Sequence, residues 1–301
     1  MIEERNLQSW QEYKKTIADI RSRYGYQEVE VPNDTDLAKG ANLPESRVYR
    51  RRNVVLFRGQ NNAAWDIRTT LERKTECRPI SISAYYSYVD HCVNEIESVT
   101  GRSWNLPAHD ELRNAPNADS LRPHLLAYDY LVYLRHHGFP SPLLDWSESP
   151  YIAAFFAFWE KPQADRVAVL CYIESIHGGW SLSKGAPTIS VRGPYVTTHK
   201  RHFAQKTWFT IATQWEEREK KHYFCPHEDV LRKPKPDQDI LIKITLPAHT
   251  RKEAIRELLD YNINPFTLFQ TEDSLIQTME LKQFDLDGDV KIEMQRGRKL
   301  V

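Results

Sequence analysis

The sequence predicts an α+β fold: a single domain built on one central or split β-sheet that is mainly antiparallel and flanked by helices. Short runs of β-branched and aromatic residues alternate with segments of helical periodicity along the chain. No internal repeat or low-complexity linker interrupts this order, and 301 residues with 41% apolar content can bury a full core. We expect the domain to span residues 1–285, followed by a charged tail at 286–301.

Amphipathic spacing places the first helix at residues 7–24. Leu7, Trp10, Tyr13, Ile17 and Ile20 recur at steps of three and four, and Gly25 follows the last turn. We therefore expect this helix to pack on the domain.

Two apolar segments predict helices in the middle of the chain. The segment "PHLLAYDYLVYLRHHG" begins with proline and ends at Gly138, the usual asymmetry of helix ends. The segment "SPYIAAFFAFWEK" is apolar on nearly all sides, which indicates burial on most faces. Further helices are expected at 81–99, "RKEAIRELLDYN" and "EDSLIQTMEL", with a loop at 101–121.

Strands are expected at 54–58, 143–146, 167–173, 203–211 and 239–246, all in the central sheet or a split pair of sheets. The first of these follows a polar loop that contains Arg47, Arg50, Arg51 and Arg52. Its apolar run stops abruptly at Arg58-Gly59-Gln60, so an apparently buried strand ends on a guanidinium and a glycine.

The net charge of the chain is zero, so the protein has no overall electrostatic field that would attract nucleic acid or a membrane surface. Lys plus Arg and Asp plus Glu both count 41, so nucleic acid would have to bind a local patch. No run approaches the roughly 18 apolar residues of a membrane span, and the N-terminus lacks a leader pattern. The four cysteines have no paired spacing, which favours reduced thiols. We expect a cytoplasmic protein without a membrane partner.

Common cofactor and metal motifs do not occur. The chain has neither a P-loop nor a G-x-G-x-x-G fingerprint, and "DLDGD" at 285–289 has its glycine at the wrong position for calcium, which favours a solvated turn. His222, Cys225 and His227 have no second pair at zinc spacing, so we expect an exposed loop and no metal site. The charged run 216–221 predicts a solvated helix face.

Two stretches, "LFRGQNNAAW" and "LRHHGFPSPLLDWSESPYIAAFFAFW", resemble the FRG domain, which is named for the Phe-Arg-Gly at 57–59. The segments "RHFAQKTWFTI" and "NINPFTLFQTEDSL" resemble later parts of the family more loosely, and the resemblance covers roughly residues 5–285. The matching positions are Phe57, Arg58, Gly59, Gln60, Trp65, His136, Gly138, Pro140, Leu143, Leu144, Asp145, Trp146, Pro150, Ala153, Phe156, Ala157, Arg201 and Gln205. The chain departs from the pattern at Arg135, where many members have glutamine, and at Pro142, where many have arginine.

The resemblance implies a distant relationship to ADP-ribosyltransferases, both in fold and in the use of NAD as substrate. It also implies a setting of bacterial conflict, as a toxin or an anti-phage defence effector. The implied NAD-binding residues are Arg58, Gly59, Gln60, Trp65 and Trp146. The implied catalytic residues are Arg58, Asp145, Gln205, Glu148 and His136.

The chemistry of NAD explains why such residues would be needed. Cleavage of the nicotinamide–ribose bond passes through an oxocarbenium-like state, as in glycoside cleavage. Arg58 can grip the ribose or pyrophosphate with a planar fork of donors, and Gly59 can offer unobstructed backbone groups to the carboxamide. Asp145 can balance Arg58 or bind a ribose hydroxyl.

Gln205 takes the place where ordinary transferases hold a glutamate. A neutral amide orients a hydroxyl but cannot act as a general base. Removal of the acceptor proton is therefore assigned to Glu148 or His136.

Each of these residues also has a structural interpretation. Arg58 and Asp145 can form an ion pair between two strands, and His136 can cap a helix C-terminus. Trp65 and Trp146 can belong to the core. Gln205 can satisfy backbone groups at a sheet edge.

Three functions remain open from the sequence. The first is a mono-ADP-ribosyltransferase that modifies single-stranded RNA or DNA, or protein, with an antitoxin as partner. For a nucleic-acid acceptor, Arg47 and Arg50–Arg52 would form a groove, with Trp208 or Tyr223 stacking bases. The second is a non-catalytic nucleotide- or nucleic-acid-binding module. The third is a metal-dependent nuclease using His136, Asp145 and Glu148.

Overall fold

A computed structural model describes residues 2–32, 46–104, 106–108, 110–111, 125–174, 185–193, 201–232 and 239–286. The expected charged tail lies outside these residues from position 287 onward.

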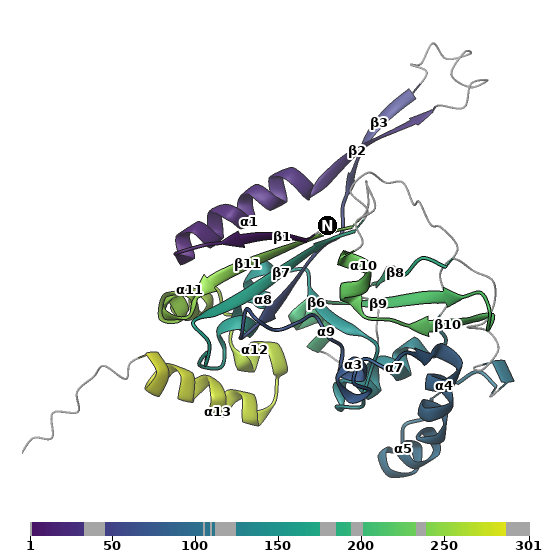
Figure 1. Ribbon diagram of the computed structural model, residues 1–301. Helices are drawn as coiled ribbons and strands as arrows, with labels where there is room; N and C mark the ends of the chain where they lie inside the picture. Colours follow the sequence, from purple (N-terminus) through teal and green to yellow (C-terminus); the bar gives the residue numbers. More distant parts are fainter. Residues whose placement is uncertain are drawn as a thin grey trace, which may run out of the picture.

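A nine-stranded sheet forms the centre of the described fold (Figure 1). Its order is β1-β11-β7-β4-β6-β9-β10-β5, with β8 paired to β9. Only β1 and β11 run parallel, and the other pairs are antiparallel. The strands are β1 (Ile2–Asn6), β4 (Val55–Gln60), β5 (Ile80–Ser81), β6 (Leu144–Ser147), β7 (Arg166–Ile173), β8 (Thr188–Arg192), β9 (Thr207–Glu216), β10 (Lys221–Phe224) and β11 (Ile240–Pro247). The predicted α+β class is confirmed, and the five predicted strands lie in this sheet as β4, β6, β7, β9 and β11.

Helices flank the sheet and include most of those predicted. Ser9 caps the first helix by accepting from Glu12 N, and Pro150 occupies the first turn of the apolar helix. The helices are α1 (Trp10–Tyr24), α3 (Thr70–Lys74), α4 (Ile82–His91), α5 (Val93–Thr100), α7 (Tyr128–His136), α8 (Pro150–Phe158), α9 (Arg201–Gln205), α10 (His227–Arg232), α11 (Arg251–Asp260), α12 (Pro265–Phe269) and α13 (Glu272–Glu280), with a 3-10 turn at Ala248–Thr250 and a π-helical segment at Leu281–Leu286.

The core lies on both faces of the sheet. The side chains of successive β7 residues point to opposite faces of the sheet. Val169 and Cys171 pack with α1, α8 and α11 on one face. Leu170 and Tyr172 pack on the other face. A further cluster joins α4 and α7 to β9. Both faces of β7 are buried, which explains why its sequence is a nearly continuous run of apolar residues.

The sheet is nearly divided between β4 and β6. These two strands share a single residue pair, Phe57 with Ser147, whereas β4 pairs with β7 over six residues. Beyond that pair, Arg58–Gln60 and Leu144–Trp146 diverge. The sheet is therefore continuous but forked at this point, and the fork leaves strand-end residues facing a space between them.

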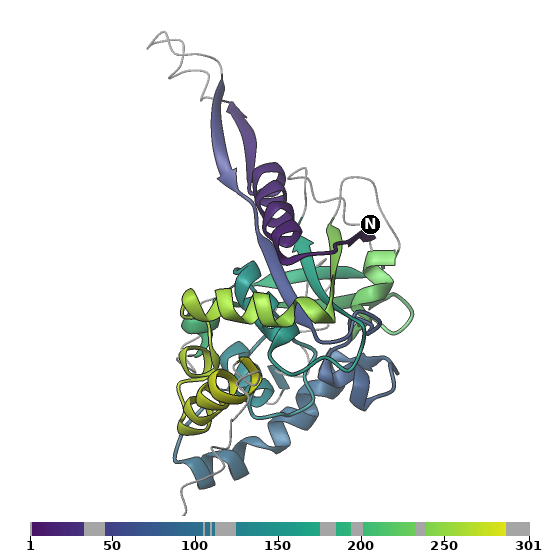
Figure 2. The same cartoon turned by 90° about the vertical axis from the view of Figure 1, so that its left-hand side faces the viewer.

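A two-stranded hairpin forms a second sheet that projects from the body (Figures 1 and 2). It consists of β2 (Tyr26–Pro32) and β3 (Ser46–Arg52). The prediction of a polar loop before Val54 was wrong, because Arg47 and Arg50–Arg52 lie on β3. The side chains of β3 lie outside what the structure describes, and so does the arginine groove expected from them.

Three local predictions were also wrong. Residues 201–205 form α9, so Gln205 lies on a helix that precedes β9, and Lys206 joins the two with a φ of 47°. The charged run 216–221 consists of the last residue of β9, the turn at 217–220 and the first residue of β10. His222, Cys225 and His227 are at most 8% exposed, on or beside β10 and α10, where we expected an exposed loop.

None of the helices in the described part of the chain is long and apolar enough to span a membrane.

We predict that Gly59→Ala destabilises the fold. A Cβ at this position would lie 2.0 Å from the carbonyl O of Ala153 and 2.6 Å from Ala157 N, both in the backbone of α8. Such overpacking typically costs about 1–3 kcal/mol in the free energy of unfolding, and thermal unfolding would measure it. The control is Gly101→Ala, where the new Cβ meets open space and only the positive φ of 67° is unfavourable. Equal melting temperatures for wild type and Gly59→Ala would show that α8 does not need this close approach.

Candidate functional site

The fork between β4 and β6 opens into a cavity of about 930 Å³. Its volume lies in the upper part of the range found for small-molecule sites. The strand ends, the loop after β4, and helices α8, α9 and α12 all contribute to its lining. The lining residues are Phe57, Arg58, Gly59, Gln60, Asn61, Ala64, Trp65, Asp66, Arg68, Arg73, Arg135, His136, Asp145, Trp146, Ser147, Ala153, Phe156, Trp159, Glu160, Arg201, Gln205, Thr207 and Phe269.

Eight of the nine residues assigned to the site from the sequence line this one cavity, and the exception is Glu148. They come from β4, β6, α7, α9 and the loop after β4, segments that are up to about 150 positions apart in sequence. Arg58, Asp145 and Gln205 all line the cavity: Arg58 and Asp145 come from the neighbouring strands β4 and β6, as expected, whereas Gln205 comes from helix α9 and not from a strand.

Arg58 spans the fork. Its Nη1 donates to the carbonyl O of Asp145 at 2.9 Å and lies 3.8 Å from the carboxylate Oδ2 of the same residue. Burial lowers the pKa of the Arg58 guanidinium, Asp145 opposes the shift, and nearby Arg135 and Arg73 add to it. Arginine stays protonated in proteins, so Arg58 remains a cation in the site.

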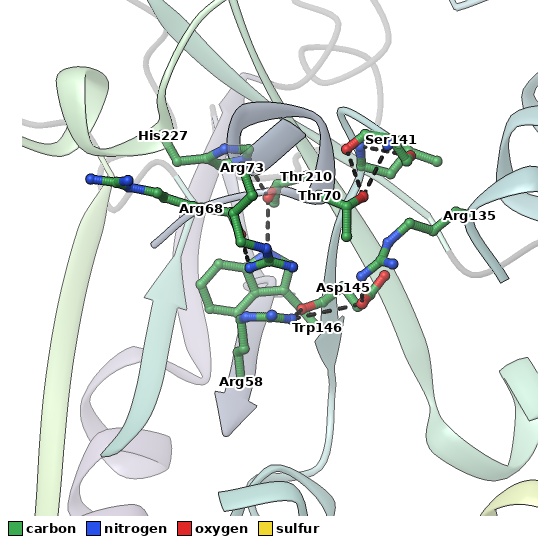
Figure 3. A network of polar contacts seen from close by, with 11 residues as sticks. Arg58, Arg68, Thr70, Arg73, Arg135, Ser141, Asp145, Trp146, Thr210 and His227 are labelled. Carbon is green, nitrogen blue, oxygen red and sulfur yellow. Dashed lines mark hydrogen bonds and ion pairs between the residues drawn. The ribbon is translucent and has the colours of Figure 1, made fainter. Parts of the chain in front are cut away.

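Asp145 has a stronger partner than the one predicted. Its Oδ2 accepts from Nη2 of Arg135 at 2.6 Å, much closer than its approach to Arg58 (Figure 3). The carboxylate is thus held between guanidiniums from α7 and β4. Arg135 is not among the residues that the sequence predicts for the site, although it stands where many members of the family have glutamine.

Gly59 and Gln60 each make a structural contact that was not predicted from the sequence. The Gly59 backbone lies so close to α8 that no side chain fits between them. Gln60 is buried, and its Nε2 donates to the carbonyl O of Asp66 at 3.1 Å, which ties the loop after β4 to its own strand. Both residues shape the cavity wall through these contacts.

The two tryptophans differ in environment. Trp65 is 55% exposed at the cavity, so the interpretation of Trp65 as a core residue is wrong. Trp146 is 4% exposed and lies in a core cluster while also lining the cavity.

A buried polar chain fixes Trp146 (Figure 3). Its Nε1 donates to Oγ1 of Thr210 at 2.8 Å, and this hydroxyl lies 3.0 Å from Nε2 of His227. His227 Nδ1 is 3.5 Å from Oε1 of Glu72, whose Oε2 accepts from Thr69 N in the capping box of α3. The Thr210 hydroxyl accepts from Trp146 Nε1 and lies within hydrogen-bond distance of His227, so it joins the two side chains.

Gln205 reaches the cavity from α9 and donates from Nε2 to the carbonyl O of Leu268 in α12 at 3.0 Å. The expected contact with backbone is therefore present, although with a helix instead of a sheet edge. His136 lies at the end of α7, with its ring centroid 4.5 Å from that of His202. Glu148 is placed beside α9, where its N donates to the carbonyl O of Lys206 at 3.0 Å.

An aromatic wall lies on the α8 and α12 side of the cavity and was not predicted. Trp159 and Phe269 lie 5.2 Å apart between ring centroids, Phe156 lies 6.1 Å from Phe269, and the guanidinium of Arg201 lies 5.8 Å from the Phe269 ring. Phe156 and Arg201 stood within the matched motifs, but no sequence signal separated them from core residues.

The cavity lining carries an excess of positive charge. Its five arginines are Arg58, Arg68, Arg73, Arg135 and Arg201, and its three acids are Asp66, Asp145 and Glu160. The planar guanidinium group forms paired hydrogen bonds with the oxygens of phosphates and carboxylates. The lining therefore combines a cationic side with an aromatic side, which suits a ligand that has both anionic and flat apolar parts.

Among the described residues, no group of three or more His, Cys, Asp and Glu side chains is arranged to hold a metal ion.

Comparison with known proteins identifies one family. The family model described as the FRG domain matches residues 53–166, which include β4, β6 and α8. No curated protein and no solved structure matches the chain.

We predict that Thr210→Val destabilises the protein by about 1–3 kcal/mol, because it leaves the buried Trp146 Nε1 and His227 Nε2 without their shared partner. Chemical denaturation would measure the loss. The control is Thr213→Val on the same strand, since Thr213 is 1% exposed and its hydroxyl has no hydrogen bond to the described residues. If both variants lose the same stability, the polar chain contributes nothing specific.

Proposed function

Because the chain carries an FRG domain over residues 53–166, with a cationic and aromatic cavity at the fork of its sheet, we propose that it binds NAD there and transfers ADP-ribose to an acceptor. The cavity carries this proposal, because arginines and aromatic rings line one half-open volume of about 930 Å³. That volume accommodates a dinucleotide.

The arginines suit the diphosphate. Arg58 makes both of its contacts to Asp145 through Nη1, so Nε and Nη2 have no hydrogen bond to the described residues. A guanidinium held in this way presents a fixed pair of donors to a phosphate, and little conformational freedom is lost on binding. Asp145 supports this arrangement, because its carboxylate is fixed in turn by Arg135.

The aromatic wall suits a base. Phe156, Trp159 and Phe269 present ring surface to the cavity, and a nicotinamide or adenine ring gains stacking energy on such a surface. Arg201 lies over Phe269 at the same wall, where a cation can also pair with a phosphate.

The proposed reaction is a transfer at the C1′ carbon of the nicotinamide ribose. The C1′–N bond breaks, nicotinamide leaves with the bonding electron pair, and a nucleophile of the acceptor forms a bond to C1′ as it loses its proton. In this scheme Asp145 and Gln205 orient ribose hydroxyls and stabilise the positive charge that develops on the sugar.

His136 is the better candidate for the group that takes the acceptor proton. It lines the cavity, whereas Glu148 does not.

In cells, consumption of NAD and modification of an essential acceptor would act as a toxin or as a defence against phage, with an antitoxin as regulatory partner. A non-catalytic nucleotide-binding module is the second candidate, because the same lining can hold a ligand without turnover. Nicotinamide release separates the two. The test incubates purified protein with NAD and quantifies nicotinamide by chromatography, and release above the rate without protein supports the enzyme.

We predict that Arg58→Ala lowers nicotinamide release by roughly tenfold to a hundredfold, the effect of one charge-assisted contact. Lysine should not restore it, because an ammonium cannot supply the planar fork. Asp145 keeps its bond to Arg135, so the fold should persist in a thermal melt. The matched control is Arg166→Ala, which removes a structural arginine away from the cavity. Full turnover by Arg58→Ala would refute the role of Arg58.

We predict that Asp145→Ala, unlike Arg58→Ala, lowers the stability of the fold. It leaves two guanidiniums without their shared carboxylate, but the Asp145 side chain is 39% exposed and water screens the loss. We expect a cost of about 1–2 kcal/mol in unfolding free energy together with loss of turnover. A stability equal to wild type, measured by chemical denaturation, would show that the two guanidiniums do not depend on Asp145.

We predict that Gln205→Ala slows turnover roughly tenfold to a hundredfold. It removes a ribose contact and also the bond from Nε2 to Leu268 O that holds α12, which carries Phe269 of the aromatic wall. Gln205→Glu should be no better, because its carboxylate faces the same carbonyl without a proton to donate. The measurements are nicotinamide release and acceptor labelling for both variants. Unchanged rates for Gln205→Ala in both assays would make Gln205 purely structural.

A further inference from the structure

The loop at residues 61–66, between β4 and α3, is anchored by hydrogen bonds to the rest of the fold. Asn61 Nδ2 donates to the carbonyl O of Ala157 at 3.0 Å and of Glu160 at 2.9 Å, at the end of α8. The N of Ala63 donates to the carbonyl O of Arg166 on β7 at 2.9 Å. The loop is therefore tied to a helix and a strand of the sheet.

The same loop presents its largest side chain to solvent. Trp65 is 55% exposed while it lines the cavity, in contrast to Trp10 at 0% and Trp146 at 4%. A ring held on an anchored loop loses little conformational entropy when a partner binds. Burial of its exposed face would be favourable in free energy, because indole is mostly apolar. These properties suit a preformed stacking platform.

Two exposed arginines share this side of the cavity. Arg68 is 48% exposed and its Nη2 lies 2.7 Å from Oδ2 of Asp66, while Arg73 donates from Nη1 to the carbonyl O of Arg68 at 3.1 Å. Both residues line the cavity. An exposed aromatic ring with neighbouring guanidiniums is the combination that binds single-stranded nucleic acid, because bases stack and phosphates pair with the cations.

We propose that Trp65, Arg68 and Arg73 form the acceptor subsite and that the acceptor is a single-stranded nucleic acid. One base stacks on Trp65, and the phosphates beside it meet Arg68 and Arg73. This inference rests on the proposed transfer function and names its acceptor class. It assigns Trp65 to the acceptor, in place of the NAD contact that the family resemblance implied. A base-paired duplex hides its base faces, so the subsite should discriminate against it.

The test measures binding without NAD, by fluorescence anisotropy of labelled RNA and DNA strands of about 12 nucleotides, a length that covers the usual site sizes. Wild type should bind single strands more tightly than the matching duplex. Trp65→Ala should weaken single-strand binding roughly tenfold, and Trp65→Phe should restore most of it, since loss of one stacked base costs about that much. Arg73→Ala should lower the slope of log affinity against log salt by about 1.

The matched control is Tyr88→Ala on α4. Tyr88 is 57% exposed, close to the value for Trp65, but it does not line the cavity. Equal affinities of wild type and Trp65→Ala, equal losses for Trp65→Ala and Tyr88→Ala, or binding of duplex as tight as of single strands would each overturn the inference.

A second measurement separates this inference from the proposed function. Wild-type protein is incubated with NAD, the single strand and a bacterial protein extract, and both nicotinamide release and the labelled products are determined. Release with label only on protein would overturn the nucleic-acid acceptor and leave transferase activity standing. Trp65-dependent strand binding without any nicotinamide release would support the platform and refute the transfer reaction.

Discussion

The single residue pair that joins β4 to β6 is the constraint on which the site depends. Phe57 and Ser147 keep the sheet continuous, and immediately beyond them the two strands separate. The separation exposes backbone groups that a regular ladder would satisfy, and the Arg58 guanidinium satisfies one of them, the carbonyl of Asp145. A strand that looks buried ends on an arginine because this side chain replaces part of the missing strand pairing and faces the cavity that results.

The close approach of α8 gives the fork its second wall. Gly59 lets the α8 backbone come within a distance that no Cβ tolerates, and the helix carries Phe156 toward the cavity, with Trp159 directly after its last turn. Gly59 therefore allows the close packing of α8 that brings Phe156 and Trp159 to the cavity. The cationic side comes from β4, α7 and the segment around α3, so the two chemical characters of the cavity arise from different elements.

The sequence predicted the strands and helices whose periodicity is set by burial, such as α1, β7 and α8, and it predicted the convergence of Arg58 with Asp145. The predictions from sequence were wrong where tertiary contacts, and not local residue preferences, decide the secondary structure or the burial of a side chain. Residues 203–205 were expected to begin the strand at 203–211, but they lie in the short helix α9, and Lys206 follows it in a left-handed conformation before β9 begins. His227 was expected at the surface because its side chain is polar. The fold instead buries it against Thr210 and Glu72. Arg135 was not assigned, because it departs from the family pattern and no sequence signal shows that its side chain reaches Asp145.

The central claim is that the forked cavity binds a diphosphate-containing nucleotide through Arg58. It is tested most directly by the thermal stability of the full chain with and without ADP-ribose, a product-like ligand that does not require turnover. At about a hundred times the dissociation constant, a ligand adds about 2.7 kcal/mol to stability, which raises the melting temperature of a chain this size by several degrees. Our account predicts this rise for wild type and for Arg166→Ala above its own unliganded melting temperature, and little or none for Arg58→Ala. The same rise in Arg58→Ala as in wild type, or no rise in wild type at saturating concentrations, would contradict it.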